Sequence, residues 1–127
     1  MLLRMNRIES SVLLLQMAIS RKNVRNTFKR NYNKVESKEL LSSFDEVKEV
    51  LEIEIEQTEE DQGEVLRDYH FNIKEIKMIS SYLENYVPML QNTAEQSGNM
   101  LEEDKQLINT LYCIRDRTKG LLDVVHA

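Results

Sequence analysis

Few residues in this chain could do chemistry: it has two histidines and one cysteine. Arg67 and His70 stand three residues apart, which on a helix places them one turn apart on the same face. A cation beside an imidazole that exchanges a proton near neutral pH would suit a helical nuclease. A single histidine beside Tyr69 is far more often structural, so the nuclease is the last of three functional hypotheses.

The remaining candidate ligands and nucleophiles do not form a set. Asp123 and His126 have helical spacing, but metal sites in helical bundles need Glu-x-x-His on two helices, and that pattern does not occur. The acidic run 36–64 lacks the oxygen spacing of a calcium loop. No histidine stands near Cys113 in the sequence to activate its thiol. We therefore expect no catalytic set, metal or cofactor, and a protein that is not an enzyme.

The segment 21–34 is strongly basic and contains no acid. Phe28 and Tyr32 lie between its cations, an arrangement that could bind the phosphates and bases of nucleic acid. The acidic run that follows offers partners within the chain, so nucleic-acid binding is the second hypothesis. If helices on either side of 34–36 form an antiparallel hairpin, the expected ion pairs are Arg30 with Glu39, Arg25 with Glu46, and Arg21 with Glu49. The residues of the predicted basic patch are Arg21, Lys22, Arg25, Lys29 and Arg30.

Composition and charge limit the class of protein. The 127 residues are 41% hydrophobic and 31% charged, with three glycines and one proline, which favours a helical domain over a β-rich one. The net charge is −5, yet residues 1–34 hold eight basic groups and one acid. No apolar run approaches the roughly 18–20 residues that span a bilayer. One cysteine favours the reducing cytoplasm as the compartment.

Apolar residues recur every three or four positions from Phe44 to Leu90, which indicates helices that share one core. We predict an all-α fold, an antiparallel bundle of four helices near 3–32, 37–60, 64–91 and 99–125, in a single domain 1–127. Gly63 is the expected turn. The heptad phase survives across it, however, so the alternative is three helices with a long central coiled-coil helix, paired as a dimer.

The first helix carries two apolar stripes, and three features mark helix ends or bends. Both stripes together predict a central position in the bundle. Ser37 is the expected N-cap of the second helix, and Asn99 with Glu102 resembles a capping box for the fourth. Pro88 is expected to kink the third helix or open a new one, with 92–98 as a loop. One stripe consists of Met5, Ile8, Val12, Leu15 and Ile19, and the other of Leu13, Met17, Val24, Phe28 and Val35.

The first functional hypothesis is an interaction protein: an adaptor, chaperone-like binder or inhibitor that presents helix faces to a protein partner. A homodimer would bury the same helix faces against a second copy of the chain. Apolar residues off the main stripe are the expected interface, because two adjacent exposed apolar faces mark an association surface. These residues are Val50, Ile53, Phe71, Ile79 and Tyr82.

Overall fold

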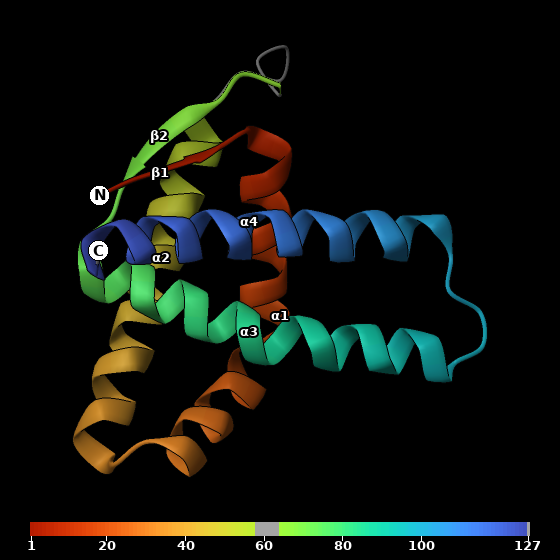
Figure 1. The fold of residues 1–127 in the computed structure, drawn as a ribbon, viewed down its shortest axis with the longest axis horizontal. Helices are drawn as coiled ribbons and strands as arrows, with labels where there is room; N and C mark the ends of the chain where they lie inside the picture. The colour runs from red at the N-terminus through yellow and green to blue at the C-terminus, as the bar shows by residue number, and fades with distance from the viewer. Residues whose placement is uncertain (58–63, 127) are drawn as a thin grey trace. The chain divides into compact units, whose positions relative to one another are not determined.

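The computed structural model describes residues 1–57 and 64–126 and confirms an all-α fold with four helices (Figure 1). The structure is 82% helical, and a two-stranded sheet accompanies the helices. The elements in chain order are β1 (Leu2–Met5), α1 (Arg7–Asn31), α2 (Lys34–Gln57), β2 (Arg67–His70), α3 (Ile73–Gln96) and α4 (Glu102–His126).

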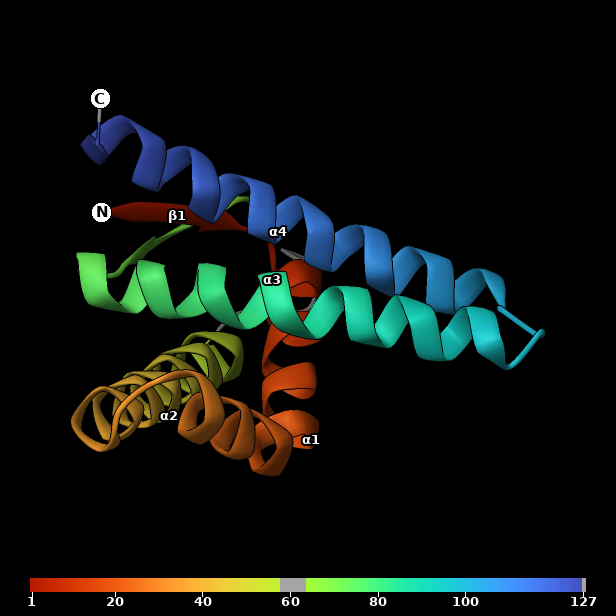
Figure 2. The ribbon, with the colours of Figure 1, turned by 60° about the horizontal axis from the view of Figure 1, so that its bottom comes forward.

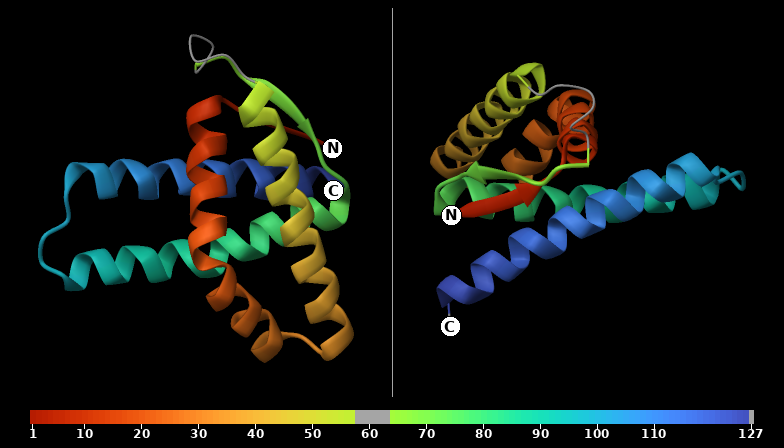
Figure 3. Two further views of the ribbon diagram at one scale, coloured as in Figure 1. Left: turned by 180° about the vertical axis from the view of Figure 1, so that it is seen from behind. Right: turned by 90° about the horizontal axis from the view of Figure 1, so that it is seen from above.

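Contacts within the chain gather in two compact units. One unit is Arg4–Asp68 and contains the hairpin of α1 and α2 (Figure 3). The other combines Met1–Leu3 with Tyr69–Ala127 and contains the hairpin of α3 and α4 (Figure 2). Short connections explain both hairpins, because a helix that follows another after a few residues packs against it in the antiparallel sense.

The α1–α2 hairpin begins and turns at asparagines. Asn6 forms a capping box with Glu9, in which each side chain accepts a hydrogen bond from the other residue's backbone N–H. After α1 ends, the Asn33 side chain accepts a hydrogen bond from the N–H of Glu36 at 2.8 Å and starts α2. The prediction that Ser37 caps this helix is wrong, since Ser37 is buried inside it.

One apolar row from each helix fills the core of this hairpin. These rows keep the three- and four-residue steps that put side chains on one helix face. The buried residues are Leu13, Met17, Val24 and Phe28 on α1, and Phe44, Val47 and Leu51 on α2.

The two strands form an antiparallel ladder. Met1 and Phe71 exchange backbone hydrogen bonds of 2.9 and 3.0 Å, which identifies them as a directly opposed pair. The same register places Arg4 opposite Asp68, and their side chains form an ion pair of 3.0 Å. Both strands lie largely within segments predicted to be helical, 3–32 and 64–91, and that part of the prediction is wrong.

The strand at 67–70 also rules out the long central helix, because a helix cannot continue through a β-strand. The predicted third helix from residue 64 therefore begins only at Ile73. The question of whether Gly63 bends the chain lies outside the described residues.

The α3–α4 hairpin differs from expectation at its turn. Pro88 lies on the exposed side of α3 and does not end it, and the helix continues to Gln96. The predicted loop 92–98 is therefore mostly helical. Gly98 has φ 70°, the left-handed conformation that glycine adopts at helix ends.

The start of α4 was also predicted incorrectly. Asn99 does not cap this helix, because Leu101 donates its N–H to Asp104 and the helix begins at Glu102.

Asn72 and Glu75 form a second capping box, at the start of α3. We expect Asn72→Ala to lower the free energy of unfolding by about 1 kcal/mol, because alanine leaves an N–H of the first turn without its partner. Urea denaturation followed by circular dichroism measures the change. Asn99→Ala is the matched control and should leave the value within about 0.5 kcal/mol. An equal loss in both variants would contradict the assignment of the cap.

Candidate interaction surface

The outward side of α1 carries an exposed apolar row. Ile8, Leu15 and Ile19 are 58%, 54% and 66% exposed, and Val12 between them is half-buried. Steps of four, three and four residues place these side chains along one line of the helix. We call Ile8, Val12, Leu15 and Ile19 the outer stripe.

The opposite side of α1 is the side that faces the core. Leu13 and Met17 are fully buried there, and Phe28 is 2% exposed. At about 100° per residue, this row and the outer stripe point in nearly opposite directions. The two predicted stripes are therefore only partly confirmed. On α1 the second stripe is buried as far as Phe28 and the first is largely exposed, but Met5 of the first stripe is buried on β1 and Val35 of the second is exposed on α2.

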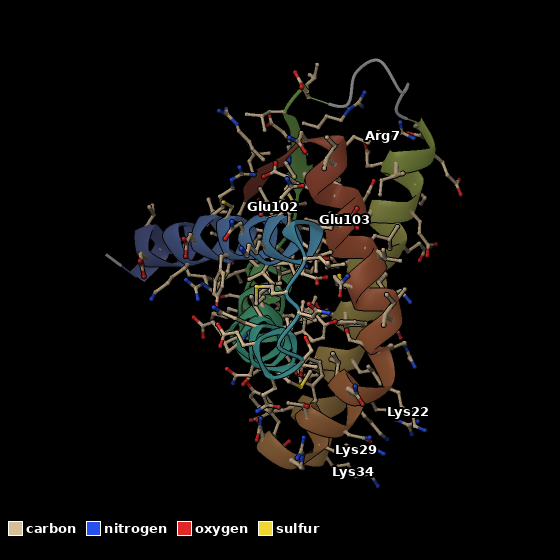
Figure 4. The ribbon with its side chains drawn as sticks, turned by 90° about the vertical axis from the view of Figure 1, so that its right-hand side faces the viewer. Arg7, Lys22, Lys29, Lys34, Glu102 and Glu103 are labelled. Carbon is tan, nitrogen blue, oxygen red and sulfur yellow. The ribbon has the colours of Figure 1, made fainter. Side chains whose placement is uncertain are left out.

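Charge is absent from the middle of the outer stripe and begins at its ends. Residues 10–20 include no acid and no base. Arg7 precedes this segment, and Lys22 and Lys29 follow it along α1, as Figure 4 shows. Within the described chain, these three cations make no ion pair. The surface therefore has an apolar middle and a basic C-terminal end, while Arg7 and Glu9 both lie at its N-terminal end.

Arg21 is the member of the predicted basic patch that binds the acidic helix. Its guanidinium donates two hydrogen bonds of 2.8 Å to the carboxylate of Asp45. The predicted ion-pair partner of Arg21 was Glu49, which lies about one helical turn from Asp45. Arg25 pairs with no acid in the described part of the chain, and Arg30 donates to the Thr27 hydroxyl at 3.4 Å. Helix α2 therefore neutralises the basic segment much less than its acid content suggests.

The ion pair of Arg21 and Asp45 predicts a specific response to acid. The hydrogen bond from Arg21 lowers the pKa of Asp45 from its ordinary value of 3.8. A carboxylate with a lowered folded-state pKa stabilises the fold above its unfolded-state pKa, and this contribution disappears as pH falls through the folded-state value. We expect Asp45→Asn to reduce the loss of unfolding free energy between about pH 5 and pH 2.

Urea denaturation at several pH values measures this difference. Glu39→Gln is the matched control, because Glu39 makes no ion pair within the described residues. If Asp45→Asn and wild type lose the same free energy on acidification, the ion pair does not stabilise the fold.

The aromatic residues of the basic segment are not available for stacking on bases. Phe28 is buried, and Tyr32 is half-buried with its ring edge against Phe28, at 6.1 Å between centroids and 78° between planes. Recognition of single-stranded nucleic acid depends on open aromatic faces. The arrangement thus removes one of the two features that suggested nucleic-acid binding, while Lys22, Arg25 and Lys29 keep the other.

Three of the five predicted interface residues do not reach the surface. Phe71, Ile79 and Tyr82 are 2%, 1% and 2% exposed. Val50 is half-buried, and Ile53 is 46% exposed on α2. The five therefore do not form one open face, and an interface role for Val50 and Ile53 stays a prediction.

Arg67 and His70 do not share a helix face. Both lie on β2, where residues three apart point to opposite sides of the strand. Arg67 is half-buried, whereas His70 is exposed. The geometry that suggested a nuclease is therefore not formed.

No three of the histidine, cysteine, aspartate and glutamate side chains in the described ranges come together as a metal site. Cys113 is exposed on α4. Among the residues described, none of the helices has the length and apolarity needed to cross a bilayer. Comparisons with protein-family models, with curated protein sequences and with solved structures gave no match to this chain.

Proposed function

We propose that this protein is a non-enzymatic interaction module that binds a protein partner along the outer stripe of α1. The observation that carries the proposal is the exposure of Ile8, Leu15 and Ile19 on a helix whose other side already supplies a core. Isolated exposed apolar side chains are ordinary, but a row of them on one helix face is typical of a surface that a second protein covers.

The free energy available from burying these side chains indicates that the partner must contact α1 over more than the outer stripe. Covering an exposed Ile or Leu side chain completely contributes about 1.5–3 kcal/mol, and these three are already partly covered. Association costs on the order of 4–15 kcal/mol in lost motional freedom. The outer stripe can therefore anchor a partner, but stable binding needs further contacts along α1. An adaptor, a chaperone-like binder and an inhibitor all work by such a surface.

Site-specific photo-crosslinking in the cells that make the protein tests this proposal. A benzophenone amino acid replaces Leu15 in one variant and Glu46, which is exposed on α2, in the control. We expect position 15 to form an adduct with another polypeptide and position 46 to form none with it. The absence of an adduct from position 15, or the same adduct from both positions, would overturn the proposal.

A further inference from the structure

We infer that the partner segment is an acidic amphipathic helix; this inference rests on the proposed function. It concerns the shape of the outer stripe and the charges at its ends. All residues that it uses belong to the Arg4–Asp68 unit, so it depends only on the α1–α2 hairpin.

The width of the outer stripe favours a helix over a membrane. The positions 8, 12, 15 and 19 alternate in steps of four and three, which makes the narrow seam of a coiled coil rather than the broad apolar face of a membrane-surface helix. Helices that insert into a bilayer surface often carry Trp or Phe beside Leu on that face. This side of α1 has none between residues 7 and 27. Small uncharged residues, Ser11 and Ala18, border the seam and allow another backbone to approach closely.

The charges at the ends of the seam favour an acidic partner. Lys22 and Lys29 lie at the C-terminal end, and Arg7 lies at the other end together with Glu9; no carboxylate of the described chain forms an ion pair with these three cations (Figure 4). A partner helix with glutamates or aspartates at the matching positions would pair with these cations. It would also gain a faster encounter, because complementary charges steer association.

A second copy of this chain meets these requirements poorly. If two α1 helices paired in parallel, Lys22 would face Lys22 and Lys29 would face Lys29. If they paired antiparallel about the middle of the seam, Arg7 of one copy would approach Lys22 of the other. The exposed side of α2 offers acids, but its two exposed large apolar residues, Val35 and Ile53, lie far apart along the helix, so they do not match the seam. A different protein whose helix combines an apolar seam with acidic borders matches both the apolar residues and the cations of this surface.

Three synthetic helical peptides test the inference. All carry the same two-heptad leucine seam, and the bordering positions are glutamate, glutamine or lysine. Fluorescence anisotropy with the full-length protein measures their affinities. We expect the glutamate peptide to bind at least about tenfold more tightly than the lysine peptide. The difference should shrink toward about 1 M salt, where the screening length falls to about 3 Å.

Charge reversal provides the matched variant. Lys22→Glu with Lys29→Glu should reverse the preference in favour of the lysine peptide, because the borders of the seam would then be acidic. Lys38→Glu, on α2, changes the net charge in the same direction. It should leave the order of the three peptide affinities unchanged.

The outcomes separate this inference from the proposed function. If all three peptides bind equally and Leu15→Ser weakens each of them, the seam binds helices but the acidic partner is overturned. Preferential binding of phosphatidylserine vesicles or of a single-stranded RNA, lost in Lys22→Glu with Lys29→Glu, would also overturn it. So would the failure of every peptide to bind while the crosslink from position 15 persists.

Discussion

Replacing Phe44 by alanine is expected to lower the free energy of unfolding by about 3–5 kcal/mol. Phe44 is fully buried on α2, in the row that continues with Val47 and Leu51. Removing the ring gives up its transfer from water and leaves a cavity that the surrounding side chains fill only in part. Domains of this size are stable by only about 5–15 kcal/mol, so the variant should lose a large share of its stability.

Urea denaturation measures this loss, and Leu15→Ala on the outer stripe is the matched control. Leu15 is 54% exposed, so its truncation should change the free energy of unfolding by no more than about 0.5 kcal/mol. Similar losses in the two variants would mean that Leu15 is part of a core, contrary to the structure.

Replacing Leu15 and Ile19 together by glutamate is expected to weaken partner binding by at least about 100-fold. Central apolar anchors of an interface each contribute about 2 kcal/mol or more, and two of them are lost here. The new carboxylates would also be desolvated against the acidic borders proposed for the partner. Since both residues are exposed in the free protein, its unfolding free energy should change by less than about 1 kcal/mol.

Titration with the partner identified by crosslinking measures the affinity of this double variant. Val35→Glu is the matched control: Val35 is 67% exposed at the start of α2 and away from the outer stripe. It adds a charge in place of an exposed apolar residue without touching the proposed surface. Unchanged affinity in Leu15→Glu with Ile19→Glu would remove the outer stripe as the interface.

Apolar periodicity predicted the helical hairpins because it reports directly on which side chains can share a face. The rows Leu13–Phe28 and Phe44–Leu51 are both read from steps of three and four residues, and both are buried. The same reasoning failed from residue 64 to residue 70. There Val65 and Tyr69 continue the helical phase by coincidence, while Val65 is 56% exposed and Tyr69 is buried on a strand.

The sequence did contain a signal that locates the helix starts. The pattern Asn-x-x-Glu occurs at Asn6, Asn33 and Asn72, and in each case the asparagine side chain accepts a hydrogen bond from the backbone N–H of the glutamate. Applying it at residue 72 would have moved the predicted start of the third helix from residue 64 to a position after β2. The pattern also misleads at Asn92, which lies inside α3, and at Asn99, where Asp104 supplies the cap instead. Capping patterns and apolar periodicity used together therefore locate helices more accurately than either signal alone.

The candidate surface could not be predicted because two stripes of α1 are equivalent in sequence. Both have helical spacing and aliphatic residues of similar size, so burial of either would release similar free energy. Which one faces α2 is decided by the way the hairpin packs, which periodicity does not report. The charges were equally ambiguous, since Arg21 binds Asp45 while Lys22 makes no ion pair within the described ranges.

The reactivity of engineered thiols on α1 tests most directly whether this helix has one covered and one open apolar side. Cys113 is first replaced by serine, because it is exposed. Single cysteines then replace Leu13, Leu15 or Ile19, and their rates with a thiol reagent are measured on the folded protein. We expect cysteines at 15 and 19 to react at close to the rate of an unfolded chain. Cysteine at 13 should react at least about 100-fold more slowly, because its exposure requires opening of the fold. Slow reaction at 15 and 19 in the protein alone would contradict an open face on α1.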